Sequence, residues 1–171
     1  MEQNEIEEIK RNSTNKEYIL KKVSQNGNLI EYADETLKQD RQIVKAAVKN
    51  TGEALEYVYT YFQEDKEIFL SAIQTFPWVI CYVGEKLAGD YELMDKCVTT
   101  YGQALYFASL EIRDDYEIVK KAVSNKGIII KYASNRLKKN LEIAKIAITN
   151  DKKSKMFIDE KLRETEEIQN I

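Results

Sequence analysis

The sequence predicts an all-α fold, an α-solenoid of about six 25-residue helix-turn-helix repeats with short capping helices. Three observations predict it. The same residue types recur every 25 residues along most of the 171-residue chain, apolar residues fall at helical spacing within each repeat, and proline occurs once. Tandem units of this kind are typical of solenoid proteins, in which each repeat buries its apolar face against its neighbours.

An aspartate or asparagine opens each repeat, because these side chains accept hydrogen bonds from the free N–H groups at a helix start. The opening residues are Asn15, Asp40, Asp65, Asp90, Asp115 and Asn140. Twelve residues later stand Gly27, Gly52, Pro77, Gly102, Gly127 and Lys152. Five residues further lies an aromatic column, Tyr32, Tyr57, Tyr82, Phe107, Tyr132 and Phe157. We expect its rings to pack along the core, because a catalytic role would need a hydroxyl and two of the six lack one.

The apolar pattern within each repeat predicts a pair of helices. In the fifth repeat, residues 118–123 carry the apolar stripe of a first helix of about ten residues. We expect Gly127 to end this helix in the left-handed conformation that glycine favours. A second helix of about eleven residues then places Ile129, Ile130 and Leu137 inward. Helices this short are marginal alone, so they depend on stacking between repeats.

The third repeat and the ends of the array depart from the pattern. Pro77 fits the first position of a second helix, where the missing N–H costs nothing. The eighth residue of a repeat is small (Ala47, Ala72, Cys97, Ala122, Ala147) except in the first, which has Lys22. We expect a capping helix at residues 2–11 with Ile6 and Ile9 inward. The predicted organisation is an N-terminal cap at 1–14, a six-repeat solenoid at 15–164 and a C-terminal cap at 165–171.

Composition excludes several functional classes. The net charge is −3, and the chain has no histidine, which removes the commonest general base and imidazole metal ligands. Its two cysteines, Cys81 and Cys97, cannot build a disulfide framework or a four-cysteine zinc site. The acidic N-terminus is unlike a signal peptide, and no apolar run is long enough to span a membrane. We therefore expect a cytoplasmic protein without cofactor or metal, with delivery into a host cell by another route left open.

The repeat also carries a family resemblance. The pattern is clearest at Asp115, Glu117, Ile118, Val119, Ala122, Val123 and Gly127, followed by Tyr132, Ala133, Ser134 and Leu137. Residues 40–48, Gly52, Ala54, Leu55 and Tyr57 match similarly. Over roughly residues 15–163 the chain resembles the helical repeat family catalogued as domain of unknown function 4116. The resemblance implies a tandem all-helical array of bacteria and some protists with no established activity, so it implies no functional residues.

An aromatic patch is the first candidate site. Helical angles place the fourteenth, seventeenth and twenty-first residues of each repeat opposite the buried stripe. In the middle repeats these positions and the adjoining turns hold Phe76, Trp78, Cys81, Tyr101, Tyr106 and Leu110. Because Trp, Tyr and Phe are enriched at interface cores, we expect these residues to bind another protein. Self-association of the chain through the same patch is the alternative.

A basic segment is the second candidate site. Between residues 120 and 155 there are eleven basic and two acidic residues, whereas residues 28–67 contain five basic and nine acidic ones. The candidate contacts for phosphate or an acidic partner are Lys120, Lys121, Lys131, Arg136, Lys138, Lys139 and Lys145. Nucleic-acid binding through this end is therefore the alternative function, although lysines lack the bidentate geometry of arginine.

The sequence shows no catalytic constellation. It has no glycine-rich phosphate loop, and Asp115 of the Asp114–Asp115 pair already has a capping role. Cys97 falls in the small core position, and Cys81 has no neighbouring base. We therefore expect a non-enzymatic protein-binding module, an inhibitor or adaptor. The many Lys, Ile, Asn and Tyr residues, typical of AT-rich genomes, suggest a phage or bacterial factor that acts against a host or its defences.

Overall fold

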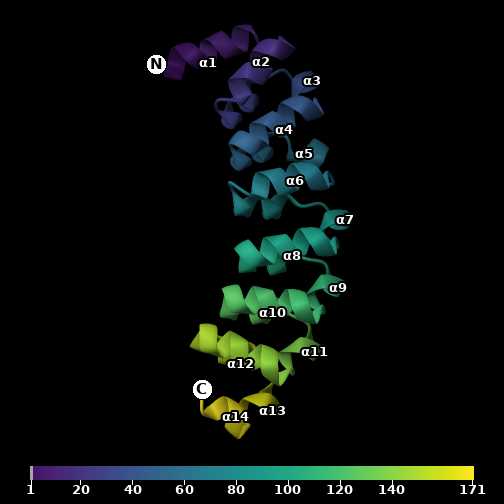
Figure 1. Cartoon of the computed structure of the whole chain (residues 1–171), viewed down its shortest axis with the longest axis vertical. Helices are drawn as coiled ribbons and strands as arrows, with labels where there is room; N and C mark the ends of the chain where they lie inside the picture. Colours follow the sequence, from purple (N-terminus) through teal and green to yellow (C-terminus); the bar gives the residue numbers. More distant parts are fainter. Residues whose placement is uncertain (1) are drawn as a thin grey trace. The chain divides into compact units, whose positions relative to one another are not determined.

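The computed structural model describes residues 2–171, with side chains from residue 4 onward, and it is helical without strands in that range. The chain divides into two compact units, Met1–Gly84 and Glu85–Ile171. Each unit has helices of two lengths stacked in sequence order (Figure 1). The predicted all-α repeat fold is confirmed. No helix in the described range is long and apolar enough to cross a bilayer.

The first helix of every repeat begins where the sequence predicts. Each opening Asp or Asn has an extended backbone, and its side chain accepts a hydrogen bond from a backbone N–H of the first turn, as Asp115 does from Ile118 at 2.9 Å. These helices are α2 Lys16–Val23, α4 Arg41–Asn50, α6 Lys66–Ile73, α8 Tyr91–Thr100, α10 Tyr116–Asn125 and α12 Leu141–Asn150.

The predicted second helix of about eleven residues is wrong. A six-residue 3₁₀ helix takes its place, followed by a two-residue link and a single α-turn, except in the second repeat, where Val58 alone forms the link. Both link residues are extended in the first, fourth and fifth repeats. The 3₁₀ helices are η1 Gly27–Tyr32, η2 Gly52–Tyr57, η3 Pro77–Tyr82, η4 Gly102–Phe107, η5 Gly127–Tyr132 and η6 Lys152–Phe157. The short helices are α3 Glu35–Lys38, α5 Tyr59–Phe62, α7 Glu85–Ala88, α9 Leu110–Arg113, α11 Asn135–Lys138 and α13 Glu160–Arg163.

Two local features explain the break in the second helix. In the fourth and fifth repeats Ser109 and Ser134 cap the short helix that follows, so the chain must be extended there. The freed backbone N–H groups of the same residues bond to the preceding repeat, Ser109 to the Ala88 oxygen at 2.8 Å and Ser134 to the Arg113 oxygen at 2.9 Å. The backbone therefore links one repeat to the next at this point.

The glycines do not end helices in a left-handed conformation, because no glycine in the described chain has a positive φ. They permit close approach instead. A Cβ on Gly27 would lie 2.2 Å from the backbone oxygen of Ala47, and one on Gly127 would lie 2.1 Å from that of Ala147. The glycine of one repeat therefore faces the small eighth residue of the next, and both must be small for the repeats to stack.

The core of each unit lies between two layers, the first helices and the 3₁₀ helices. In the first unit α2, α4 and α6 are neighbours, as are η1, η2 and η3, and in the second unit α8, α10, α12 and η4, η5, η6 repeat this arrangement. The third and fourth residues of η1 to η5 are buried, among them Ala54, Leu55, Ile129 and Ile130, whereas in η6 Ser154 is buried and Lys155 is half-buried. The aromatic column is only half-buried, at the margin of the core rather than within it.

Short helices lie at both ends of the chain. Helix α1 (Glu2–Arg11) contacts η1, with Ile9 fully buried and Ile6 half-buried. Lys22 is half-buried and pairs with Glu5 of α1 at 2.8 Å. Helix α14 (Glu166–Gln169) buries Ile168, whose backbone oxygen accepts a hydrogen bond from Lys155 at 3.1 Å. Pro77 occupies the first position of η3, as predicted.

Candidate interaction surface

Two residues of each 3₁₀ helix form a surface on which the side-chain type changes from repeat to repeat. Since a 3₁₀ helix has about three residues per turn, side chains three apart lie above one another. The fourteenth and seventeenth residues of each repeat therefore share one side of the helix, away from the buried pair. We call these the outer positions. They are Asn28 and Glu31, Glu53 and Glu56, Trp78 and Cys81, Gln103 and Tyr106, Ile128 and Lys131, and Lys153 and Met156.

In the first unit the outer positions of η1 and η2 are acidic. Glu31, Glu53 and Glu56 are exposed, and the Asn28 amide donates a hydrogen bond to Glu53 Oε2 at 3.2 Å, which joins the two neighbouring 3₁₀ helices. The pKa of the Tyr57 hydroxyl is raised, first by burial and then by the three carboxylates around it. These acids therefore lie close enough to act on one side chain together.

The outer positions of η3 in the first unit are apolar. Trp78 is 48% exposed, which is unusual for the largest apolar side chain. Cys81 and Phe76 are half-buried, and burial raises the pKa of the Cys81 thiol above its ordinary value. A further aromatic pair lies in this unit, because Tyr59 and Tyr82 stack with ring centroids 4.8 Å apart.

In the second unit an aromatic cluster forms around Tyr106. This side chain is 49% exposed, and its ring centroid lies 4.9 Å from that of Phe107 and 4.7 Å from that of Tyr132 on the next 3₁₀ helix. Lys131 lies over the Tyr132 ring at 4.7 Å. The cluster therefore combines one exposed ring, two half-buried rings and a cation, and it spans two repeats.

The predicted aromatic patch divides between the two units. Phe76, Trp78 and Cys81 belong to the first, whereas Tyr101, Tyr106 and Leu110 belong to the second. A single patch that combines all six stays a prediction. Within the second unit, Tyr101 is half-buried and caps η4, and Leu110 begins α9 instead of continuing the helix of Tyr106.

Leu110 is the most exposed large apolar residue, at 77%. It borders an open groove of ≈ 580 Å³ between α7 and α9, together with Glu85, Glu111 and Arg113. Arg113 turns its guanidinium toward the end of η4, where Nε donates to the Ala108 oxygen at 2.9 Å. The groove thus has a fixed basic residue and an unburied leucine at its edge.

Three residues of the second unit's surface were not predicted from the sequence. Met156 is 65% exposed at an outer position of η6, Lys153 is exposed at the other, and Tyr132 joins the cluster around Tyr106. The 25-residue register would have found Lys153 and Met156, since they lie at the same positions as Trp78 and Cys81. Tyr132 gave no such signal, because it lies in the aromatic column expected to be in the core.

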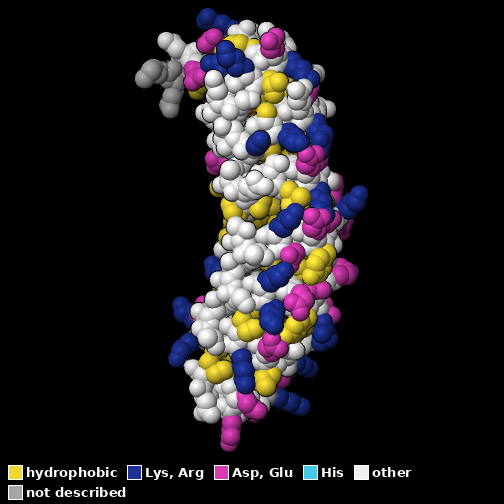
Figure 2. All heavy atoms as spheres, in the orientation of Figure 1, with side chains coloured by type: hydrophobic (Ala, Val, Ile, Leu, Met, Phe, Trp, Pro, Cys, Tyr) yellow, Lys and Arg dark blue, Asp and Glu magenta, His cyan; other side chains and the backbone are white. Residues whose placement is uncertain are grey.

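Four of the predicted basic contacts are paired with carboxylates. The lysine pairs are Lys120 with Glu142 at 2.7 Å, Lys121 with Asp95 at 2.5 Å, and Lys139 with Asp159 at 3.9 Å. Arg136 pairs with Asp114 at 3.0 Å. Hydrogen bonds to Glu142 and Asp95 raise the pKa values of Lys120 and Lys121. The pairs of Lys120 and Lys121 lie on the first helices, whereas those of Arg136 and Lys139 lie at the short helices. Basic and acidic side chains are interspersed on the face shown in Figure 2.

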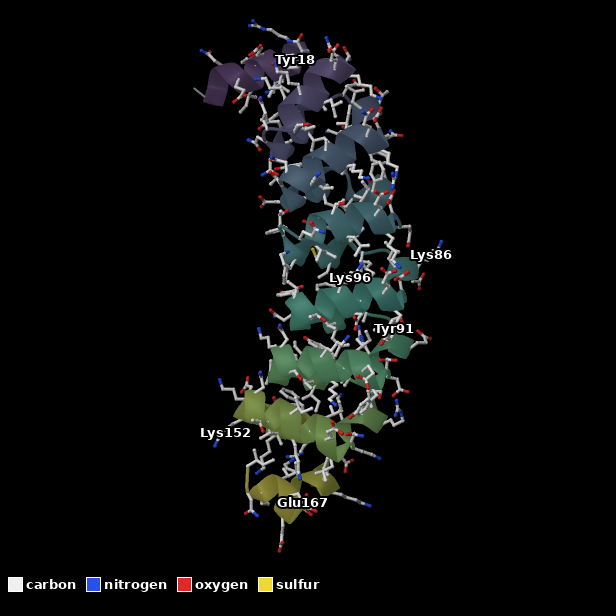
Figure 3. All side chains as sticks on the ribbon, viewed as in Figure 1. Tyr18, Lys86, Tyr91, Lys96, Lys152 and Glu167 are labelled. Carbon is white, nitrogen blue, oxygen red and sulfur yellow. The ribbon has the colours of Figure 1, made fainter. Side chains whose placement is uncertain are left out.

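The other predicted basic contacts have varied surroundings. Lys131 belongs to the aromatic cluster, and burial lowers the pKa of Lys138. Lys145 borders a shallow groove with Ile146 and Thr149. Lys152, at the start of η6, extends away from the ribbon (Figure 3). The basic segment therefore presents its unpaired lysines mainly along η5 and η6.

Between residues 4 and 171 no three Cys, Asp or Glu side chains are grouped closely enough to hold a metal. Cys97 is 2% exposed, and burial raises the pKa of its thiol to about 12. Its side chain fills the small position of the fourth repeat, where a thiolate would be costly.

Comparison with known proteins identifies the repeat and nothing more specific. The model of the family described as "Domain of unknown function (DUF4116)" matches residues 15–63, 65–113 and 115–163. Each match spans two of the 25-residue repeats and begins at an opening Asn or Asp. No curated protein and no solved structure matches the chain.

Proposed function

Because the chain belongs to the DUF4116 family of helical repeats, we propose that it works as a non-enzymatic module that binds another protein in the cytoplasm. The observation that carries this proposal is the exposure of large aromatic side chains at the outer positions. Trp78 and Tyr106 are 48% and 49% exposed, although rings of this size normally bury most of their surface. Aromatic residues presented on a rigid scaffold are typical anchors of protein interfaces.

The repeat architecture supports this proposal. The inner residues fix the backbone of every repeat, so the outer residues vary without cost to the fold. In the second unit Tyr106 is held between Phe107 and Tyr132, which restricts its ring and lowers the entropy lost on binding. An inhibitor or adaptor would use such a preformed surface to cover or to link its partner.

The test is capture of partner proteins from the source organism by the immobilised chain, with identification by mass spectrometry. We expect Trp78→Ala or Tyr106→Ala to lower affinity for a specific partner about thirtyfold, the effect of an interface hot spot of about 2 kcal/mol. The chain offers matched controls, because Tyr61 and Tyr91 are 48% and 49% exposed but lie outside the outer positions. Tyr61→Ala and Tyr91→Ala should leave capture unchanged.

Capture that survives both Trp78→Ala and Tyr106→Ala would refute the proposed surface, as would equal losses in the two control variants. Purified partner should then be titrated against each variant, so that affinity is measured directly. Circular dichroism of each variant, matching the unmodified chain, shows that a loss comes from the interface and not from unfolding.

Nucleic-acid binding is the alternative, and Lys131, Lys152 and Lys153 favour it because they have no carboxylate partner in the described part of the chain. The ion pairs of Lys120, Lys121 and Arg136 weigh against it. Salt separates the two functions, because phosphate contacts weaken steeply between about 50 and 200 mM salt whereas an aromatic anchor does not. Binding of a labelled duplex that disappears over this range would support the alternative.

A further inference from the structure

The outer positions of the two units carry opposite charges. In the first unit they include Glu31, Glu53 and Glu56, and in the second they include Lys131 and Lys153, with Lys152 adjacent. Within residues 4–171 none of these six has an ion-pair partner within 4.0 Å. The same backbone position is thus acidic in one unit and basic in the other.

Ion pairs between neighbouring repeats occur elsewhere in each unit. On the first-helix face, charges pair between neighbouring repeats, as Lys16 does with Asp40 at 2.6 Å and Arg41 with Asp65 at 2.7 Å. The 3₁₀-helix side instead gathers like charges, and the carboxylates of Glu31, Glu53 and Glu56 all act on the Tyr57 hydroxyl. A surface of opposite charge is the electrostatic complement of such a group.

We propose that the acidic outer positions of the first unit bind the basic outer positions of the second unit of another copy of this chain. Charge complementarity favours this occupant, because each copy presents both surfaces on the same type of 3₁₀ helix. Each of the two surfaces also has an exposed ring near its charges. Trp78 lies on η3, which contacts η2, and Tyr106 lies on η4, which contacts η5. The contact can be made twice in a symmetric pair or once per copy in a growing chain.

This inference is independent of the proposed function, since it depends on the charged outer positions and not on capture of a different protein. Its test is sedimentation equilibrium of the purified chain over a range of protein concentrations. At about 20 mM salt we expect the average mass to rise above the 19.9 kDa monomer as concentration increases. At about 0.5 M salt we expect the monomer mass, because screening then acts within a few ångströms.

Charge reversal identifies the surfaces. We expect Glu53→Lys with Glu56→Lys to abolish association, and Lys131→Glu with Lys153→Glu to do the same. An equimolar mixture of these two double variants should associate again, because one is then basic and the other acidic on both surfaces. Rescue in the mixture distinguishes a specific contact from a general loss of solubility.

The matched controls change the same charges elsewhere. Glu7→Lys with Glu17→Lys alters the first unit on α1 and α2, and Lys161→Glu alters the second on α13. None of these three residues has an ion pair in the described chain. Both control variants should associate like the unmodified chain. A monomer at every concentration at low salt overturns the proposal, and so does association that the outer-position reversals leave unchanged or that the controls abolish equally.

Discussion

Helices η2 and η5 have nearly the same backbone and inner residues but opposite outer chemistry. Both begin with a buried glycine, turn two apolar residues inward and end with a half-buried tyrosine. At the outer positions η2 has Glu53 and Glu56, whereas η5 has Ile128 and Lys131. The inner residues are thus alike in the two helices, whereas the outer residues differ in charge.

Truncation of one inner and one outer residue of η5 that are adjacent in sequence tests this difference most directly. Ile130 is fully buried, so Ile130→Ala should lower the free energy of unfolding by about 2–5 kcal/mol. Lys131 lies on the outer side, so Lys131→Ala should change it by less than about 0.5 kcal/mol. Urea denaturation followed by circular dichroism measures both, and similar losses would contradict the division into inner and outer positions.

The next largest loss of stability is expected from substitution of Gly127, the glycine at the start of η5. Gly127→Ala places a Cβ 2.1 Å from the Ala147 backbone oxygen, which forces the two repeats apart and should cost about 1–3 kcal/mol. Gly89 is the control, because the nearest atom to a Cβ there is 3.6 Å away. Gly89→Ala should therefore be tolerated. If both substitutions proved equally mild, close approach would not be the reason for the glycine.

The 25-residue register predicted the fold class and the start of each first helix, because capping aspartates and apolar stripes are local signals. The second helix was mispredicted although a local signal was present. Ser109 and Ser134 are good N-cap residues, but both fall within a continuous apolar pattern that favoured one longer helix. The backbone hydrogen bonds to the preceding repeat, which stabilise the break, are tertiary and leave no mark in the sequence.

For the candidate site, exposure was predictable and pairing was not. Trp78 and Tyr106 are exposed as the helical angles predicted, since these angles depend on register alone. The partners of Lys120 and Lys121, however, are Glu142 and Asp95, which lie 22 and 26 residues away in sequence. Which charges pair depends on side-chain geometry between repeats, so the net charge of a segment could not show which lysines remain unpaired.

Two junctions between neighbouring repeats of the first unit differ in the side-chain hydrogen bonds that cross them. Asn50 accepts a hydrogen bond from the Gly27 N–H at 3.0 Å, which Thr51 also accepts at 3.2 Å, and Asn50 donates one to the Ser24 oxygen at 3.1 Å. Thr75 accepts one from the Gly52 N–H at 2.8 Å, and its other hydrogen bond, to the Ala72 oxygen at 3.4 Å, stays within its own repeat. Asn50→Ala should therefore cost about 1–2 kcal/mol and Thr75→Ala about half as much. Thermal unfolding of the two variants measures the difference. A larger loss of stability in Thr75→Ala than in Asn50→Ala would show that the hydrogen bonds of Asn50 do not hold the two repeats together.

The smallest expected effect is a pH dependence that differs between the units. Hydrogen bonds from Lys45 and Arg41 lower the pKa of Glu67 in the first unit from 4.5 to about 2, whereas those from Lys120 and Tyr116 lower the pKa of Glu142 in the second unit less. A carboxylate whose pKa is lower in the folded than in the unfolded chain stabilises the fold above pH 4.5, and this contribution is lost as the pH falls toward 2.

Glu67→Gln should therefore flatten the decline of the unfolding midpoint between about pH 5 and 2, and Glu142→Gln should flatten it less. Because both side chains are exposed, the changes will be small, and high salt should reduce them further by screening. Urea midpoints at several pH values for the three proteins provide the measurement. A steeper decline in Glu67→Gln than in the unmodified chain would mean that the ion pairs between α4 and α6 do not stabilise the first unit.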